Sequence, residues 1–194
     1  MSISNRVRVR QSEILHEGWS TLSQATFEYQ RRDGNWQTQV RDNYDCGHGA
    51  AILLYNLEYR TVILIRQFRY AAFSDGYDNL LIETPAGLLD DASPEERIRA
   101  DAEEETGYRA RDVRKVLEAY VSPGDVVQKI FCFVGTYGAD ERVSEGGGLA
   151  SEGEDIEVLE VPFDAACTMI ADGRIRDAKT IMLLQYAALH LFDG

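Results

Sequence analysis

Apolar and polar positions alternate over several short stretches of the chain, which indicates β-strands separated by turns. Residues 21–30 alternate in this way and are rich in Thr, Phe and Tyr. The turn-forming segment RDGN follows at 32–35, and residues 36–44 then return as a second strand. Together these segments predict a β-hairpin. Further strands are predicted at residues 50–56, 61–70, 80–84, 113–120, 129–137 and 156–161.

One predicted helix carries clear signals at both ends. Ser93 suits the N-cap, Pro94 suits the first helical position, and Glu96 completes a capping box. The helix is expected to run over residues 94–105 and to stop at Gly107, because glycine is favoured just past helix ends. Apolar residues at helical spacing predict two more helices, at residues 163–171 and 179–191. The order of strands and helices indicates the α/β class.

Length and composition are those of an ordinary globular protein. A chain of 194 residues suits one domain, or one domain with a small appendage. Apolar residues make up 44% of it, yet no stretch approaches the length of a membrane span, and the N-terminus lacks the apolar region of a signal peptide. The widely spaced Cys46, Cys132 and Cys167 match neither a disulfide framework nor a zinc site. A cytoplasmic protein that does not bind membranes is therefore expected.

The charge of the chain restricts its partners. The formal net charge is −13 and the sequence pI is about 4.6. Binding to a nucleic-acid backbone needs a basic surface, so nucleic acid is not expected as a partner. A small anionic ligand still fits, provided that a metal ion or a local group of arginines reverses the field at the site.

The predicted helix at 94–105 places three carboxylates together. Asp101, Glu104 and Glu105 are spaced i, i+3 and i+4, so they share one side of the helix. Carboxylates held so closely repel one another, and a divalent cation such as Mg²⁺ or Mn²⁺ would remove that repulsion. A strand end and a glycine turn before the helix are expected to bring the backbone carbonyl of Ala86 close to them. The alternative is an acidic helix face exposed to solvent.

Residues 87–108, with the sequence GLLDDASPEERIRADAEEETGY, resemble the Nudix box, a loop–helix–loop metal site. Gly87 matches the opening glycine of that motif, and EETGY at 104–108 matches its ending. The spacing between the two is one residue shorter than in the common form, as it is in the GDP-mannose pyrophosphatase branch of the Nudix family. The chain is similar to that branch over nearly its whole length, in segments 47–56, 62–69, 85–90, 104–108, 122–124, 153–163 and 173–180.

Two further positions of the box depart from the usual pattern. Ser93 replaces the first Glu and keeps a structural role in the capping box. Ala100 and Asp101 replace Arg-Glu, and we expect Arg97 or Arg99 to supply the missing basic side chain, unless each is only an exposed helix residue. Asp101 is one methylene shorter than Glu, which bears on the fit of Mg²⁺ because that ion requires oxygens at about 2.0–2.1 Å.

The resemblance implies a Nudix fold of the α/β class, with a mixed β-sheet flanked by helices in an α/β/α sandwich and an N-terminal β-hairpin appendage. Residues 1–45 would form the N-terminal β segment, and residues 46–194 would form the Nudix hydrolase domain. The related branch forms homodimers through such N-terminal segments, so the resemblance also implies a homodimer.

The same resemblance implies roles for the acidic residues. Glu152, on the acidic loop at 149–155, would be the general base, and Glu104 would also take part in catalysis. Glycines in and before this loop would let it close over the site, and the alternative is a disordered acidic surface segment. The implied ligands of Mg²⁺, with Mn²⁺ as a substitute, are the backbone oxygen of Ala86 and the side chains of Asp101, Glu104, Glu105 and Glu154.

Arginines and an aromatic residue are expected to contact the substrate. Arg69 and Arg41 would clamp its phosphates, because a planar guanidinium group binds two oxygens at once. Arg66 either shares this role or pairs with an acidic neighbour. Trp19 would lie against the substrate, or would instead be a core or dimer-interface residue.

The implied reaction is Mg²⁺-assisted hydrolysis of a nucleoside-diphosphate sugar to a nucleoside monophosphate and a sugar 1-phosphate. GDP-mannose is the first expected substrate, since Lys179 matches a substrate-contacting residue of that branch. Gln128 would also contact the substrate, but it stands where the family carries Glu, which leaves the base preference open and makes ADP-ribose the second expectation. The altered box motivates a rival of another class, a regulator that binds a nucleotide-sugar without cleaving it.

Overall fold

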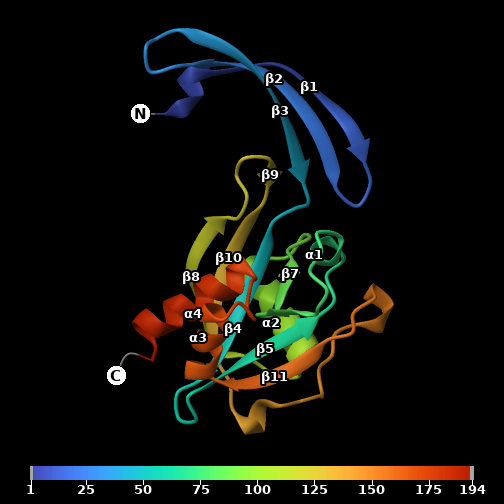
Figure 1. The fold of residues 1–194 in the computed structure, drawn as a ribbon, viewed down its shortest axis with the longest axis vertical. Helices are drawn as coiled ribbons and strands as arrows, with labels where there is room; N and C mark the ends of the chain where they lie inside the picture. Colours follow the sequence, from blue (N-terminus) through green and yellow to red (C-terminus); the bar gives the residue numbers. More distant parts are fainter. Residues whose placement is uncertain (1, 193–194) are drawn as a thin grey trace. The chain divides into compact units, whose positions relative to one another are not determined.

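The structure, a computed structural model, describes residues 2–192 (Figure 1). The chain divides into two compact units. The first comprises Met1–His48 and Tyr120–Lys129, so it takes in a segment beyond the expected residues 1–45. The second comprises Gly49–Ala119 and Ile130–Gly194. No helix within residues 2–192 is long and apolar enough to cross a membrane.

The first unit is a sheet with the strand order β1-β2-β3-β9. Strand β2 runs antiparallel to both β1 and β3, and β9 runs parallel to β3. The pairing of Gln30 with Trp36 and of Thr21 with Asp45 confirms the hairpin predicted from the sequence. A 3₁₀ helix at Ile3–Arg6 is followed by β1 (Val7–Glu17), β2 (Thr21–Gln30), β3 (Trp36–Asp45) and, later in the chain, β9 (Val126–Val127).

Strand β1 was not expected from the sequence. Its residues after Val7 are all exposed, so neither face is buried. Apolar and charged residues alternate only over residues 7–10, and the sequence analysis did not predict a strand from this short pattern. Pairing with β2 and contacts between side chains hold it in place. Arg10 donates to the Glu28 carboxylate at 3.0 Å, and the Arg8 guanidinium lies 3.7 Å from the centre of the Trp36 ring. The predicted hairpin is thus part of a larger, four-stranded sheet.

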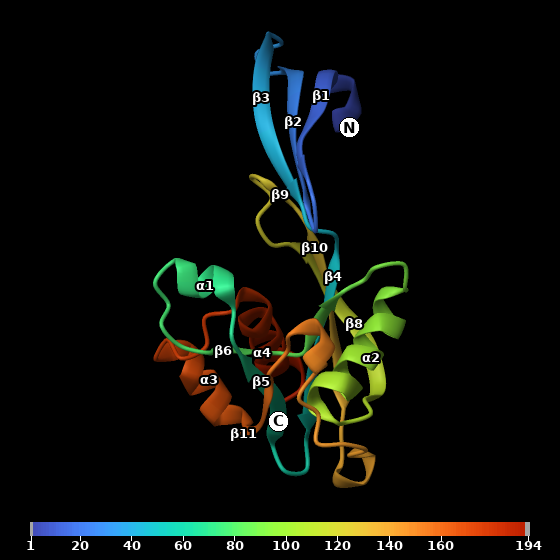
Figure 2. The same cartoon turned by 90° about the vertical axis from the view of Figure 1, so that its right-hand side faces the viewer.

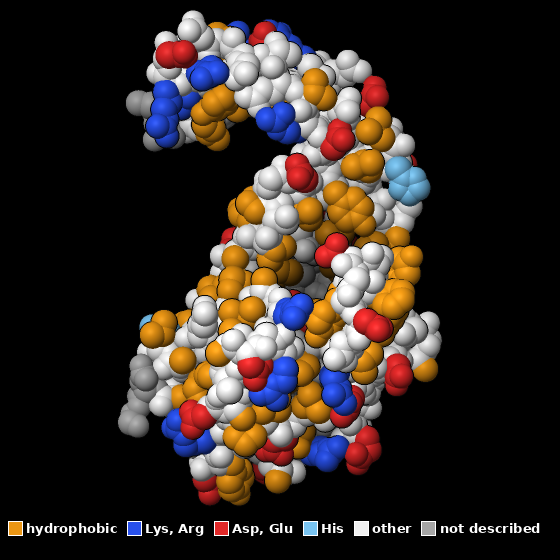
Figure 3. Space-filling view, viewed as in Figure 1, with side chains coloured by type: hydrophobic (Ala, Val, Ile, Leu, Met, Phe, Trp, Pro, Cys, Tyr) orange, Lys and Arg blue, Asp and Glu red, His pale blue; other side chains and the backbone are white. Residues whose placement is uncertain are grey.

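The first unit has no core of its own. None of its residues is buried over the described stretches 2–48 and 120–129. Large apolar side chains remain on its surface (Figure 3), and they include Val9, Ile14, Leu15, Trp19 and Val40. A small sheet of this kind needs an apolar face packed against another surface in order to be stable.

The second unit is built on a seven-stranded sheet with the order β11-β5-β4-β10-β8, in which β6 pairs with β5 and β7 pairs with β4. Strand β10 runs parallel to β4, whereas β5 runs antiparallel to β4 and to β11, so the sheet is mixed. The strands are β4 (Gly49–Asn56), β5 (Thr61–Gln67), β6 (Leu81–Glu83), β7 (Ala86–Leu88), β8 (Arg111–Tyr120), β10 (Lys129–Thr136) and β11 (Glu157–Pro162). The helices are α1 (Tyr70–Ser74), α2 (Pro94–Thr106), α3 (Phe163–Ala171) and α4 (Ala178–His190).

The central strand β4 is buried on both faces and divides the core into two layers. Its residues Ala51, Leu53 and Tyr55 pack with buried residues of α3 and α4. The alternate residues Ala50, Ile52 and Leu54 pack with Ile98 and Ala102 of α2. Figure 2 shows α2 on one side of the sheet, and α3 and α4 on the other. The expected mixed sheet in an α/β/α sandwich is therefore confirmed.

Strand β5 is shorter than the sequence predicted. It ends at Gln67, whereas the apolar pattern extended it to Tyr70, which instead begins α1. Phe68 and Tyr70 are 53% and 73% exposed, so these apolar residues mark a surface turn rather than a buried strand. The short elements α1, β7 and β9 were not predicted, because so few positions establish no periodicity.

Helix α2 begins and ends as the sequence predicted. The Ser93 hydroxyl accepts a hydrogen bond from the Glu96 amide, and the Glu96 carboxylate accepts one from the Ser93 amide. The helix ends at Gly107, which has a left-handed φ of +77°. The capping box and the terminal glycine together fix where the carboxylates of this helix stand.

The last turn of α2 is capped by a glycine segment from a distant part of the chain. The Gly147 amide donates to the Glu105 carbonyl at 2.9 Å, and the Gly148 amide donates to the Glu104 carbonyl at 3.2 Å. Gly146, Gly147 and Gly148 all have positive φ. A Cβ on Gly146 would lie 2.6 Å from the Glu105 carbonyl oxygen. These glycines therefore permit close approach to the helix, besides the mobility that the sequence suggested.

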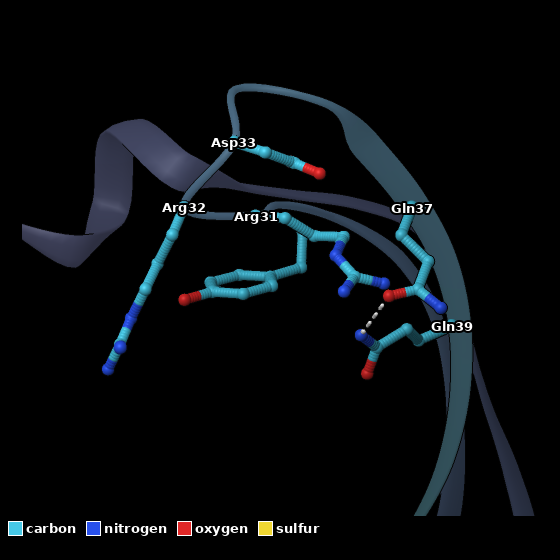
Figure 4. A pocket seen from close by; sticks show the side chains of 6 residues that line it. Arg31, Arg32, Asp33, Gln37 and Gln39 are labelled. Carbon is cyan, nitrogen blue, oxygen red and sulfur yellow. Dashed lines mark hydrogen bonds between the residues drawn. The ribbon is translucent and has the colours of Figure 1, made fainter.

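A surface hollow of about 480 Å³ lies at the tip of the β2–β3 hairpin (Figure 4). Within it, Gln39 donates a hydrogen bond to the Gln37 side chain at 3.4 Å. Its lining residues are Tyr29, Arg31, Arg32, Asp33, Gln37 and Gln39. Only one of them is a carboxylate, so the hollow lacks the several oxygen ligands that a divalent cation needs.

We predict that Gly107→Ala destabilises the protein by about 2–5 kcal/mol, because it combines a left-handed backbone with a steric clash. A Cβ there would lie 2.2 Å from the Ser144 carbonyl oxygen. Gly76→Ala is the matched control, since Gly76 has a φ of +91° but no atom within 4 Å of its added Cβ. It should cost only about 1–2 kcal/mol. Urea unfolding measures both, and equal losses would contradict the packing of residues 143–148 against α2.

Candidate active site

Asp101 is a nearly buried carboxylate on the side of α2 that faces β7. Its side chain is 3% exposed. One oxygen, Oδ1, lies 2.8 Å from Nε of Arg97, whereas Oδ2 has no hydrogen-bond partner among the described residues. A Cβ on Gly87 would come within 2.2 Å of Oδ2. Gly87 is therefore required by the approach of this carboxylate, and a buried anionic oxygen is left without compensation.

Glu105, one turn further along α2, is buried beside the same strand. It is 4% exposed, and its Oε2 accepts a hydrogen bond from the Ala86 amide at 3.2 Å. The backbone of Ala86 thus lies beside Glu105, although the contact is made by its amide, whereas the sequence analysis expected its carbonyl there. The two carboxylates contact adjacent residues of β7, so the glycine turn and the helix form one acidic site.

Burial and mutual repulsion keep these carboxyl groups from ionising. Burial raises the pKa of Glu105 to about 8 and that of Asp101 to about 7. Part of each rise comes from neighbouring charges, which are those of Asp101 and Glu154 for the pKa of Glu105, and those of Glu104, Glu154 and Glu152 for the pKa of Asp101. The pKa of Glu104 is raised by burial and by the charges of Glu154 and Glu152. A bound cation would reverse these shifts because it favours the ionised forms.

The acidic loop after the glycine segment takes a defined conformation. Glu154 accepts a hydrogen bond from the Leu149 amide at 2.8 Å, and a Cβ on Gly148 would lie 2.3 Å from the same Glu154 oxygen. Glu152 ends a 3₁₀ turn at Ala150–Glu152 and is exposed. The loop is therefore folded in this structure, which argues against the disordered alternative.

The donor set of this site fits a hard divalent cation. Its side chains offer carboxylate oxygens, and neither His nor Cys contributes, which suits Mg²⁺ or Mn²⁺ better than zinc. Such an ion would give the unpartnered oxygen of Asp101 a partner. It would also lower the raised pKa values of Asp101 and Glu105. Within residues 2–192, no three His, Cys, Asp or Glu side chains are arranged so as to hold a metal ion. Binding would therefore have to draw the repelling carboxylates together.

The basic residue lost at Ala100 is replaced by Arg97 in this structure. Arg97 forms the ion pair with Asp101, one turn further along the helix. Arg99 instead pairs with Glu95 at 2.9 Å on the exposed side of the helix. Of the two arginines that the sequence left open, Arg97 is the one that contacts the acidic site.

A second charged cluster, centred on Glu83, was missed by the sequence analysis. Arg69 binds the Glu83 carboxylate through two hydrogen bonds of 2.9 Å, and Lys179 reaches the same carboxylate at 2.8 Å. Lys179 also contacts Asp177 at 2.9 Å. These contacts explain a lysine in the first turn of α4, where it opposes the helix dipole. The signal was the single acidic residue in the apolar run LLIETP at 80–85.

Arg66 takes the second of the two roles considered for it. Its Nε donates to Glu157 on the neighbouring strand β11 at 2.9 Å, and the two residues are register partners. Pairing with an acidic neighbour is thereby confirmed for Arg66. Arg69, in contrast, keeps an exposed edge, since 42% of its side chain is accessible.

The remaining expected substrate residues belong to the first unit, whereas the acidic site belongs to the second. Trp19 lies between β1 and β2 and is 80% exposed, which excludes the core role considered for it. Arg41 lies on β3 and donates only to the carbonyl of its neighbour Val40, at 2.8 Å. Gln128 follows β9 and is half-buried.

Residues 6–44 match the family model described as the GDP-mannose pyrophosphatase NudK N-terminal domain. The chain is also similar to proteins named GDP-mannose pyrophosphatase over nearly its whole length. It is 49% identical to that of Yersinia enterocolitica serotype O:8 over 189 residues, which cover 97% of this chain and 98% of the relative. It is 46% identical to that of Yersinia pestis (strain Pestoides F), covering 99% and 96%, and 46% identical to that of Klebsiella pneumoniae, covering 95% and 92%. The chain therefore belongs to the GDP-mannose pyrophosphatase family of Nudix hydrolases.

Proposed function

We propose that this chain is a cytoplasmic Mg²⁺-dependent GDP-mannose pyrophosphatase that adds water across the diphosphate and releases GMP and mannose 1-phosphate. The observation that carries the proposal is the likeness, over nearly the full length of both chains, to relatives named for this activity. The family generally uses a divalent metal ion. The buried carboxylates of α2 supply the oxygen ligands that such an ion requires.

The residues of the acidic site have distinct tasks in this reaction. The residues that would hold the ion are Asp101, Glu104, Glu105 and Glu154, through their carboxylates, and Ala86, through its backbone oxygen. When bound, Mg²⁺ neutralises the charge of the diphosphate and acidifies a water molecule. Glu152 is exposed on its loop and accepts the proton of the attacking water as the general base. Glu104, on the same side of α2 as the other carboxylates, also takes part in catalysis.

Arg69 and Lys179 bind the diphosphate. Arg69 follows β5 and carries a guanidinium group that is partly exposed, which suits a planar phosphate contact. Its pKa is influenced by the charge of Glu105, so it lies within electrostatic reach of the acidic site. Substrate charge is thus met from two sides, by the ion and by these side chains.

We also propose a homodimer in which a second copy covers the first unit. The support is that this unit has no buried residue over its described stretches and exposes large apolar side chains. A second copy would bury them, and Trp19, Arg41 and Gln128 would then contribute to substrate binding. Light scattering should give the mass of two chains. A single-chain mass at every concentration would contradict this proposal.

The function is tested by turnover on GDP-mannose, ADP-ribose and UDP-glucose with Mg²⁺ or with EDTA. We expect Mg²⁺-dependent release of GMP from GDP-mannose and a loss of at least about 10²-fold in kcat for Glu105→Gln. Glu95→Gln, on the exposed side of the same helix, is the control and should stay within about twofold of wild type. If the protein cleaves ADP-ribose faster than GDP-mannose, ADP-ribose hydrolysis becomes its assigned activity. Tight binding without turnover on every substrate would favour a non-catalytic regulator.

The raised pKa values predict how the metal-free protein responds to pH. Unfolded Asp and Glu ionise near pH 4, but Asp101 and Glu105 do so at about 7 and 8 in the folded protein. Between these values the folded protein binds more protons, so its free energy of unfolding falls as pH rises from about 4 to 8. The lowered pKa of Glu83 contributes a slope of opposite sign, which fades above about pH 6 because the carboxyl group is then ionised in both states. Mg²⁺ should restore stability at the upper end of this range.

Removing Arg97 should extend this loss of stability to higher pH, because Arg97 lowers the pKa of Asp101. Arg97→Met and the matched control Arg99→Met are unfolded in urea with EDTA between pH 4 and 9. Arg99→Met should follow wild type, since Arg99 pairs with Glu95 alone among carboxylates. A double variant, Asp101→Asn with Glu105→Gln, should lose most of the slope. A wild-type slope in that double variant would contradict the assignment.

A further inference from the structure

Glu83 is a buried carboxylate that the proposed reaction does not use. It lies at the end of β6, is 1% exposed, and belongs to none of the groups that would hold the ion. It accepts two hydrogen bonds of 2.9 Å from Arg69 and one of 2.8 Å from Lys179. One buried anion thus holds two cations from separate elements side by side.

The two cations keep donors that Glu83 does not occupy. A guanidinium group has five N–H donors, and Arg69 uses two of them on Glu83. An ammonium group has three, and Lys179 uses one on Glu83 and one on Asp177. Arg69, whose side chain is 42% exposed, can therefore bind an anionic oxygen without leaving Glu83, and Lys179, which is 14% exposed, keeps one donor for the same purpose.

The support behind the cations is rigid because three elements meet there. Arg69 follows β5, which pairs with β6 next to Glu83. The Thr84 amide donates to the Thr180 hydroxyl in the first turn of α4 at 2.7 Å, and Asp177 caps the same helix through the Thr180 amide at 2.9 Å. The positions of both cations are thus fixed by the packing of β5, β6 and α4.

The stability of the fold alone does not explain why Glu83 is buried with two cations. Burying ion pairs costs solvation, and replacing such groups by apolar side chains is often neutral or stabilising. The exposed edge of Arg69 points instead to a task in binding. Glu83 also stands three residues before Ala86, whose amide contacts Glu105, so the chain places this cluster next to the acidic site. An anion that already neutralises two cations lowers their mobility, so less entropy is lost when substrate binds.

We propose that Glu83 is a positioning residue that holds Arg69 and Lys179 as a two-cation clamp for the diphosphate of the nucleotide-sugar. This inference rests on the proposed function. The clamp binds the phosphate oxygens, and the substrate does not touch Glu83 itself. Loss of Glu83 should therefore weaken substrate binding far more than it slows the chemical step.

Glu83→Gln tests the clamp because the amide keeps the size of the side chain but carries no negative charge. It has only one oxygen to accept the hydrogen bonds that Arg69 and Lys179 donate to the carboxylate. We expect KM for GDP-mannose to rise by about tenfold, with kcat within about threefold of wild type. Glu83→Asp keeps the charge with a shorter reach and should give an intermediate KM. It also serves if Glu83→Gln does not fold. Unchanged KM in the folded variants, or a lower KM, would overturn the proposal.

A control and a double-variant background separate positioning from a general effect on the fold. Glu95→Gln removes an exposed carboxylate partner of an arginine and should leave KM unchanged. In a chain that already carries Arg69→Met and Lys179→Met, adding Glu83→Gln should change KM by less than about twofold, because nothing remains to be positioned. A further tenfold rise in that background would mean that Glu83 acts by another route.

Binding without turnover distinguishes failure of this inference from failure of the proposed function. Calorimetry in EDTA measures the affinity of the protein for GDP, which carries the diphosphate but lacks the sugar. Wild type should bind GDP about tenfold more tightly than Glu83→Gln. If Glu83→Gln binds GDP more weakly but wild type does not hydrolyse GDP-mannose, the clamp is supported and the proposed activity is contradicted. Hydrolysis with equal GDP affinities would retain the activity and reject the clamp.

Discussion

The burial of Asp101 and Glu105 against the β7 turn is the constraint on which the site depends. Both carboxylates are under 5% exposed, yet they meet only one arginine, one backbone amide and each other's field. With pKa values of about 7 for Asp101 and about 8 for Glu105, these groups are only partly ionised near neutral pH, and a bound cation would favour their ionised forms. Free energy that could have stabilised the fold is therefore available to metal binding, because the ion relieves a repulsion that folding has imposed.

The neighbouring Glu83 cluster has the opposite balance. There, one buried carboxylate is compensated by Arg69 and Lys179, and its pKa is lowered although burial alone would raise it. In the acidic site the carboxylates thus outnumber their one arginine partner, Arg97, whereas in the Glu83 cluster two cations share the Glu83 carboxylate. A diphosphate would have to meet both a metal ion and fixed cationic donors, so in the proposed reaction the two clusters would have complementary tasks.

Elements with strong local signals were predictable, and those set by long-range contacts were not. The capping box and Gly107 placed α2, and the spacing of its carboxylates placed the acidic site. Strand β1 escaped prediction because both of its faces are exposed. The pairing of Arg69 with Glu83 and the docking of Gly147 on Glu105 join residues far apart in sequence, so no local pattern contains them.

The departures from the usual Nudix box make physical sense together. Ala100 removes a basic side chain from the helix, and Arg97 restores one three residues earlier, where it contacts Asp101 directly. The shorter Asp101 can approach the turn closely because Gly87 has no side chain to prevent it. The substitutions at positions 100 and 101 look like losses when the motif is compared letter by letter. The buried carboxylates are nevertheless kept, and Arg97 and Gly87 determine how Asp101 is placed.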